Sequence, residues 1–354
     1  GVTTMTCCVM LALTGVFDIS TAFSGLANKT TILIACMFTV AYAFGKTSLI
    51  NKVRNSMERI KGKSGLGFIV FLFLVTIVLS QLMGRTAIVS IVALFLVSLD
   101  DKDEICASRM IFAAFAVMAA WSLKFPVGLG ATMSPTANAY YEGIISNPAL
   151  MLLPGDFIKV SFIPATALTI YALFAWKSIP RHAVNTSDVK EVKETAAISR
   201  RDEIIINIVF IGVLLGFIFG AKIGSLMYVI PAAGVLVLLY TKTLTAKETV
   251  DSLTGDMVWM IAGVLVMSDA IGRSGVGDMI GNGLLVLLGD KPSGIFVLFV
   301  FAVTAIVMTT FMSNTGTAAV LTPIAASLSM VAGMDPRGIV LIINIASIMA
   351  IAFP

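Results

Sequence analysis

The sequence predicts an all-α polytopic membrane protein made of two inverted repeats. Of its 354 residues, 58% are hydrophobic and 12% are charged, whereas roughly a quarter of an average soluble domain is charged. Apolar runs recur along the chain at about the ~17–25 residues that cross a bilayer as a helix. The two halves also carry the same order of features. In each half we expect an amphipathic interface helix, a re-entrant helical hairpin and a broken transmembrane helix.

A polar, basic linker at 177–202 separates a first repeat, 1–176, from a second repeat, 203–354. Outside the hairpins, apolar runs predict helices over 3–17, 29–45, 106–124, 157–176, 203–221, 226–241, 256–271 and 338–354. The first residue is Gly1, and Pro354 ends the sequence inside an apolar run. We therefore expect the protein to continue at both ends, with a helix before the first repeat and a C-terminal part after the second.

Two amphipathic arms orient the halves. Segment 46–63 has apolar residues at helical spacing on one face and basic residues on the other, which is typical of a helix in the membrane interface. It carries six basic residues and one acidic residue, whereas segment 272–291 carries two of each. The positive-inside rule places the first arm and the linker at 177–202 in the cytoplasm. Counting spans from there places the second arm outside, so the repeats are inverted.

Two long apolar runs, 65–99 and 293–332, are interrupted near the middle. About 20 residues suffice for one span, so each run is too long for a single helix. The interruptions are Gly84-Arg85-Thr86 and Ser313-Asn314-Thr315. Non-helical backbone at bilayer depth is tolerated only where it is buried in protein or lines a cavity. Each run is therefore predicted to be a re-entrant hairpin whose tip holds an ion or a small anion.

The two halves match in a single register. The sequence AFGKTSL at 43–49 corresponds to AIGRSGV at 270–276, and the two hairpin interruptions correspond to each other. Phe125-Pro126 falls on Phe353-Pro354, and the offset stays at 227 to 229 throughout. Interrupted segments at corresponding positions of two halves point to a transport site at the bilayer midplane.

Enzymatic chemistry finds little support in the sequence. The one histidine, His182, lies in the basic linker, and the four cysteines show no metal-ligand spacing. Histidine-ligated metal catalysis and a Ser–His–Asp triad are therefore disfavoured. An intramembrane enzyme would need paired acids, and Asp156, Asp256 and Asp269 are scattered. We expect a transporter with no organic cofactor and no nucleic-acid partner, surrounded by the lipid bilayer of the cytoplasmic membrane.

The run MSNTGTAAVLTPIA at 312–325, the arm before each hairpin and the inverted repeat resemble the divalent anion–sodium symporter (dicarboxylate transporter) family of the ion transporter superfamily. The resemblance covers nearly the whole chain. It implies a homodimer with a fixed scaffold and a transport domain that moves like an elevator. It also implies that two Ser-Asn-Thr tips meet at the midplane, where each binds a substrate carboxylate and helps to bind Na⁺.

In the second repeat this resemblance assigns Ser313, Asn314 and Thr315 to the substrate. It assigns Na⁺ to Thr309, Ser313 and Asn314, with a backbone carbonyl near Ala352. These side chains supply the hard oxygen donors that Na⁺ requires, and N–H groups at a half-helix N-terminus favour a carboxylate. Local hydrogen bonds to helix carbonyls are the structural alternative for the Ser and Thr side chains.

The first repeat departs from the family pattern. It keeps Ser80 and Gly128 as weaker Na⁺ candidates and Asn138 as a substrate candidate, but Gly84, Arg85 and Thr86 replace Ser-Asn-Thr at the substrate tip. An arginine at bilayer depth normally faces a cavity or a partner. We expect Arg85 to bind a carboxylate or to replace Na⁺. The alternative is that Arg85 extends to water or pairs with Asp100 or Asp101.

Two further ionisable side chains lie at span ends or within a span. Lys124 ends the helix predicted at 106–124, where it is either a fixed cation beside the first tip or a side chain that extends to the surface. Asp269 lies inside an apolar helix. It either relays protons or pairs with Arg273 one turn later, and the pair is the interpretation we favour.

The sequence therefore predicts a secondary active transporter of small dianions, with C4-type dicarboxylates as the first choice. Sulfate, citrate and an inorganic oxyanion such as arsenite are the alternative substrates. Coupling to Na⁺ at the second tip and anion exchange both stay open, because the first tip has lost the family's pattern at Arg85.

Overall fold

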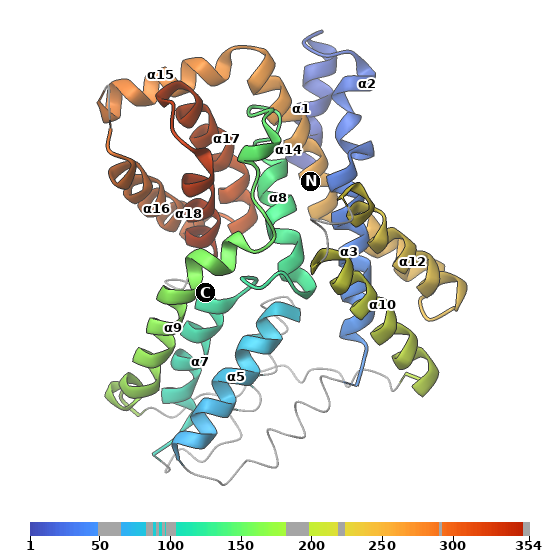
Figure 1. Ribbon diagram of the computed structural model, residues 1–354, viewed down its shortest axis with the longest axis vertical. Helices are drawn as coiled ribbons and strands as arrows, with labels where there is room; N and C mark the ends of the chain where they lie inside the picture. The colour runs from blue at the N-terminus through green and yellow to red at the C-terminus, as the bar shows by residue number, and fades with distance from the viewer. Residues whose placement is uncertain are drawn as a thin grey trace.

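The protein is all-helical over the residues that the computed structural model describes (Figure 1), which are 1–48, 65–82, 88–89, 92–93, 96, 104–181, 198–218, 224–289 and 292–349. The first half contains α1 (Val2–Leu13), α2 (Ile19–Ala22), η1 (Ser24–Ala27), α3 (Lys29–Gly45), α5 (Leu66–Leu82), α7 (Ala107–Trp121), η2 (Gly128–Thr132), α8 (Met133–Ala139), η3 (Pro148–Leu150), α9 (Asp156–Ala175) and η4 (Trp176–Ser178). The second half contains α10 (Arg200–Ile218), η5 (Gly224–Tyr228), α12 (Ile230–Tyr240), α13 (Ala246–Leu253), α14 (Asp256–Arg273), α15 (Val276–Leu288), α16 (Gly294–Phe311), α17 (Asn314–Ala332) and α18 (Pro336–Ile348).

The helix boundaries repeat at the offset that the sequence indicates. Helices α1, α3, α5 and α7 correspond in order to α12, α14, α16 and α18. At the two extremes, α1 ends at Leu13 and α12 at Tyr240, while α5 ends at Leu82 and α16 ends at Phe311. Every start and end in the four pairs is separated by 227 to 229 residues. The two halves therefore build the same helices in the same order.

The contacts between the halves are reciprocal. Helix α1 packs on α14, and its counterpart α12 packs on α3, the counterpart of α14. A Cβ at Gly263 of α14 would lie 2.5 Å from Thr4 Cβ of α1, and a Cβ at Gly234 of α12 would lie 3.7 Å from Val40 of α3 and 2.9 Å from Val209 of α10. Small residues let membrane helices approach closely. In both contacts, the first paired helix of one half packs on the second paired helix of the other half, as a pseudo-two-fold axis between the halves produces. The opposite membrane orientation of the halves stays a prediction.

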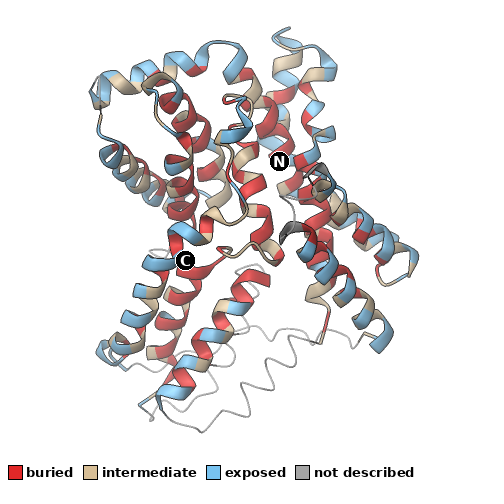
Figure 2. Cartoon of the chain, viewed as in Figure 1, coloured by how far each residue is buried: buried red, intermediate tan, exposed pale blue. Residues whose placement is uncertain are grey.

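The helices form three groups around a central segment (Figure 1). One group contains α5, α7 and α9, a second contains α15, α16, α17 and α18, and a third contains α3, α10, α12 and α14. Helix α8 lies where the groups meet: its Ala139 belongs to the core of the third group, and its Ala137 belongs to a separate core with residues of α9, α17 and α18. The buried faces of the helices point into these groups, whereas many outward faces are exposed (Figure 2).

The second hairpin has clear end signals in the sequence. Ser293 caps the N-terminus of α16 by accepting a hydrogen bond from the Phe296 N–H. Gly333 ends α17 in the left-handed conformation, with φ +65°, which only glycine adopts without strain. Asp335 and Pro336 then begin α18. These end signals set the outer bounds of the run at 293–332, which forms two helices, as predicted.

The structure confirms a polytopic membrane fold. Four helical stretches of the described chain are long and apolar enough to cross a bilayer: Asp156–Ser178, Ala246–Arg273, Gly294–Phe311 and Asn314–Ala332. Large apolar side chains lie exposed on α16, for example Ile295 and Phe299, and on α9, for example Ile163. Lipid is the environment in which such faces are stable, because contiguous apolar surface of this extent is rare on soluble monomers.

The last predicted helix and the second amphipathic arm both have counterparts among the described residues. The last helix was expected over 338–354; α18 covers Pro336–Ile348, and residues 350–354 lie outside the described residues. On α15, Gly277 and Gly281 are buried against Ser327 of α17, while Val276 and Leu287 of the apolar stripe are exposed, as expected for a helix in the membrane interface. Close backbone approach, and not apolar side-chain area, determines which face of α15 packs.

Several predicted segments fall partly outside the described residues. They are the arm at 46–63 beyond residue 48, the first interruption at 84–86 and most of the linker at 177–202. In the second arm of the first hairpin, Ile88, Val92 and Leu96 are helical and fully buried in the α5–α7–α9 group. This packing agrees with a second helical arm returning after the break.

Candidate functional site

The tip of the second hairpin lies where α16 ends and α17 begins. Ser313 has an extended backbone and caps α17, its hydroxyl accepting a hydrogen bond of 3.1 Å from the Gly316 N–H. Asn314 and Thr315 form the first turn of α17, and both are half-buried. The N-terminus of this 19-residue helix carries partial positive charge. The tip therefore provides a place for an anion.

Behind the tip, Thr309 joins α16 to α17 and α18. Its side chain is 4% exposed, and its Oγ1 lies 2.7 Å from the Ser347 carbonyl oxygen and 2.8 Å from Asn314 Oδ1. A hydroxyl has one proton and donates only one of these two bonds at a time. Three oxygen-bearing groups from three helices thus converge.

This oxygen cluster fits a monovalent hard cation. A hydroxyl, a side-chain amide and a backbone carbonyl near the end of α18 are the donor types that Na⁺ prefers in broken membrane helices. No carboxylate belongs to the cluster, and the described ranges contain no group of three or more His, Cys, Asp or Glu side chains placed to hold a metal. A neutral oxygen set suits Na⁺ better than Ca²⁺, which is usually held by carboxylates.

The end of the first half's α5 shows a contact that sequence reasoning missed. Gln81 is 5% exposed, and its Nε2, which has two protons, lies within hydrogen-bond distance of three oxygens: the carbonyls of Trp121 at 2.7 Å and Ile77 at 3.1 Å and Ser80 Oγ at 2.9 Å. Its Oε1 accepts from the Phe125 N–H at 3.1 Å. The sequence signal for this contact was Gln81 itself, an amide side chain that follows Ser80 at the end of an apolar run.

Gly128, which the sequence offered with Ser80 as a weaker Na⁺ candidate, lies in the same neighbourhood. It begins η2 with φ +57°, and a Cβ there would lie 2.7 Å from the Gln81 carbonyl oxygen. Only glycine permits both the conformation and the approach. The structure therefore brings Ser80, Gln81 and Gly128 together between the end of α5 and the break after α7.

Lys124 lies in the break that follows α7. Its side chain is 1% exposed, so its ammonium does not extend to the surface of the described structure. Gly84, Arg85, Thr86 and Ala352, which the sequence assigned to the site, lie outside the described residues. Their contributions stay predictions.

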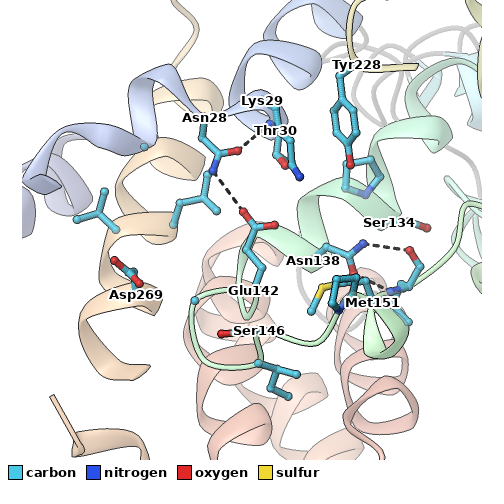
Figure 3. A pocket seen from close by; sticks show the side chains of 18 of the residues that line it. Asn28, Lys29, Thr30, Ser134, Asn138, Glu142, Ser146, Met151, Tyr228 and Asp269 are labelled. Carbon is cyan, nitrogen blue, oxygen red and sulfur yellow. Dashed lines mark hydrogen bonds between the residues drawn. The ribbon is translucent and has the colours of Figure 1, made fainter. Parts of the chain in front are cut away.

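A separate cavity of about 800 Å³ opens between the third helix group and the segment that follows α8 (Figure 3). Asn138 lines it, but both ends of the Asn138 amide bind the Leu152 backbone, with Nδ2 donating at 3.0 Å and Oδ1 accepting at 2.8 Å. Asn138 therefore holds the loop before α9 in place. Its role as a substrate ligand stays a prediction.

The same cavity contains a half-buried carboxylate. Glu142 accepts a 3.3 Å hydrogen bond from the amide of Asn28, whose other end caps α3 (Figure 3). Burial raises the pKa of Glu142 above its ordinary value, and Lys29 and the Asn28 bond oppose this shift. Next to it, Gly143 lies directly against α14, because a Cβ at Gly272 would be 2.2 Å from the Gly143 carbonyl oxygen. Glu142 thus lies at a tight junction of two helix groups.

On the far side of this cavity, Asp269 accepts a 2.8 Å hydrogen bond from Arg273 one turn later on α14. The pairing that the sequence favoured for Asp269 is therefore present. A proton relay through Asp269 finds no support in this contact.

Comparison with known proteins places the whole chain among transporters. Residues 1–346 match the family described as citrate transporter. An uncharacterized transporter of Haemophilus influenzae is 23% identical over 361 aligned positions, which cover 96% of this chain and 75% of that protein. The crystal structure of the Alcanivorax borkumensis YdaH transporter, which has an unusual topology, covers 98% of this chain and 78% of its own, with a TM-score of 0.59 and 13% identity. The structural likeness supports the helical transporter fold.

Proposed function

Because this chain belongs to the citrate transporter family, we propose that it carries small anions with two or three carboxylates across the cytoplasmic membrane by secondary active transport. The family consists of transporters and not of enzymes. The observation that carries the substrate proposal is the tip of the second hairpin. There, Ser313, Asn314 and the N-terminus of α17 present hydroxyl, amide and backbone N–H groups to an anion.

The family description favours citrate, and the resemblance of the tip to dicarboxylate transporters favours C4-type dicarboxylates. Both substrates are small, flexible carboxylates, and one N-terminal helix end suits one carboxylate group of either. A second group would be bound by the first tip at 84–86, with Arg85 as its bidentate partner. Sulfate and inorganic oxyanions are the competing substrates.

A sodium ion at the second tip would be held by Thr309, Asn314 and the Ser347 carbonyl. When bound, it supplies positive charge beside the substrate's carboxylate. The chain's own residues orient the site: Thr309 ties α16 to α18, and Ser313 fixes the start of α17. Anion exchange without sodium is the alternative, since the first tip keeps a fixed cation, Arg85.

Alternating access would come from movement of the two hairpin groups against the group of α3, α10, α12 and α14. Support for this proposal comes from the separation of the cores, because each hairpin packs mainly with its own neighbours. An elevator movement and a homodimer are the forms implied by the resemblance to the dicarboxylate transporters. The linker at 177–202 would then lie in the cytoplasm.

Uptake of labelled citrate and succinate into proteoliposomes tests the proposal. Uptake that depends on an inward Na⁺ gradient supports symport. Equal uptake without Na⁺, stimulated by internal citrate or succinate, supports exchange. Competition by sulfate or arsenite, with no uptake of either carboxylate, would rule out the proposed substrate class. Vesicles with the Asn314→Ala variant serve as the control for uptake that bypasses the site.

A further inference from the structure

Corresponding helix ends are joined in different ways in the two halves. In the second half, the Thr309 hydroxyl of α16 meets the Ser347 carbonyl near the end of α18. In the first half, the corresponding helices are α5 and α7, and the Gln81 amide meets the carbonyl of Trp121, the last residue of α7. Both contacts link the end of a hairpin's first arm to the end of a broken helix.

The residue that corresponds to Gln81 by the repeat offset is Thr310. Its hydroxyl donates to the Ile306 carbonyl at 2.8 Å, and Gln81 Nε2 donates to the Ile77 carbonyl, which is the equivalent group. The local bond is therefore the same in both halves. Gln81 is longer, however, and its Nε2 also contacts Ser80 Oγ and the Trp121 carbonyl. Ser80 is the counterpart of Thr309 by the same offset.

The orientation of the Gln81 amide follows from its partners. The Phe125 N–H requires an acceptor, whereas the carbonyls of Ile77 and Trp121 require donors. A turned amide would place its oxygen 2.7 Å from the Trp121 oxygen and its NH₂ group against the Phe125 N–H. The NH₂ group must therefore face the three oxygens. Because this group is buried and bears partial positive charge near the C-terminal ends of α5 and α7, it lies where a cation is also favoured.

We propose that the Gln81 amide takes the place of a bound cation in the first half. Its NH₂ group occupies the oxygen cluster of Ser80, Ile77 and Trp121, so this cluster takes up no metal cation. In the second half, the counterpart Thr310 bonds the Ile306 carbonyl of its own helix and leaves the cluster of Thr309, Asn314 and the Ser347 carbonyl to Na⁺. The difference between the two halves rests on the proposed function as well, because it assumes that the second half binds Na⁺. The assignment of Gln81 itself depends only on the first-half contacts.

Thermal unfolding of the purified protein in matched sodium and choline salts, in mildly alkaline buffer, tests the proposal. Gln81→Glu keeps the size of the side chain but replaces the NH₂ group with a carboxylate oxygen. Four oxygens then face one another, an arrangement that either a bound cation or a proton on the carboxylate stabilises, and the alkaline buffer favours the cation. We expect Na⁺ to raise the Tm of this variant by ~3 °C or more beyond its effect on the wild type, as saturation of an added site does. Gln81→Ala, which opens space among the same oxygens, should gain a smaller shift.

Gln81→Leu is the matched control. It has no polar atom and fills the space, so it should lose stability equally in sodium and choline. The double variant Gln81→Glu/Asn314→Ala should keep the new sodium-dependent shift. This result separates the first-half site from the proposed second-half site, since the shift must survive even if the wild type shows no sodium effect.

The proposal is overturned if Gln81→Glu and Gln81→Ala unfold at the same temperature in both salts. If Gln81→Glu does not fold in either salt, Gln81→Ala decides alone. A converse variant, Thr310→Gln, places an amide at the corresponding position of α16. It should abolish any sodium-dependent Tm shift of the wild type, and retention of a full shift in a folded Thr310→Gln protein counts against the proposal.

Discussion

The hydroxyl of Thr309 lies 2.7 Å from the backbone carbonyl of Ser347, across 38 residues of sequence. This contact joins the first arm of the second hairpin to the end of α18. The same hydroxyl lies 2.8 Å from Asn314 at the start of α17. One side chain therefore connects the three helix ends that meet at the tip. A ligand that moves one of these ends also changes the contacts of the other two.

Asn314→Ala should abolish sodium dependence, or transport itself, while the fold stays nearly intact. The amide contacts Thr309, but alanine is a good helix former, and its cost at the start of α17 should be only about 1 kcal/mol. We expect at least about a tenfold fall in sodium-driven uptake, which corresponds to about 1.4 kcal/mol. Reconstituted uptake and thermal unfolding measure the two effects. Thr310→Ala, which loses only the bond to the Ile306 carbonyl on its own helix, is the matched control. A wild-type uptake rate in Asn314→Ala would remove the site from consideration.

Arg85→Ala should weaken anion binding by about tenfold or more, because a hydrogen bond to a charged group contributes about 1.5–3 kcal/mol. The substituted position lies outside the described residues, so this expectation rests on the sequence at the first tip. Titration of substrate against the purified protein measures the affinity. Arg85→Lys should restore only part of it, because an ammonium cannot make the bidentate contact. Unchanged affinity in both variants would mean that Arg85 extends to water.

Glu142→Gln should flatten the pH dependence of stability. Burial raises the pKa of Glu142 in the folded protein, so the folded state holds this proton more tightly than the unfolded state, where the pKa is about 4.3. The contribution of Glu142 is therefore fully present below the unfolded value and is lost as the pH rises through the folded value. Glutamine can still accept the bond from Asn28. Thermal unfolding should show the wild type losing stability relative to Glu142→Gln as the pH rises above ~4. The difference in Tm should become constant once the pH exceeds the folded pKa of Glu142. Parallel curves at every pH would contradict the raised pKa.

Gly272→Ala should destabilise the protein by about 1–3 kcal/mol through overpacking. The added Cβ would meet the Gly143 carbonyl oxygen at 2.2 Å, and a backbone atom cannot rotate away as a flexible side chain can. Gly283→Ala on α15 is the control, since nothing lies within 4 Å of its Cβ, and alanine favours a helix by about 1 kcal/mol. Circular dichroism melts compare the two variants. Equal stability of the two would show that α14 and the segment after α8 are not in close contact.

Much of the fold follows from sequence patterns. The helices at 29–45 and 256–271, and the break between α16 and α17, lie where the apolar runs and end signals place them. The pair of Asp269 and Arg273 follows from helical spacing alone. Local spacing carries no information about Gln81, whose main partner is 40 residues away. The glycine face of α15 was likewise missed, because apolar periodicity reports side-chain area and not how closely two backbones approach.

The sequence by itself determined the class of protein, the repeat and the hairpin tip at Ser313, because these depend on composition, on a constant offset and on local helix ends. The tertiary structure decided which atoms meet. It shows that Thr309 bonds the Ser347 carbonyl in one half, while the Gln81 amide meets the oxygens of Ser80, Ile77 and Trp121 in the other. Two similar stretches of sequence can therefore differ in what they bind. Gln81 is longer than its counterpart Thr310 by two heavy atoms, so it reaches the Trp121 carbonyl, which only the folded chain brings near.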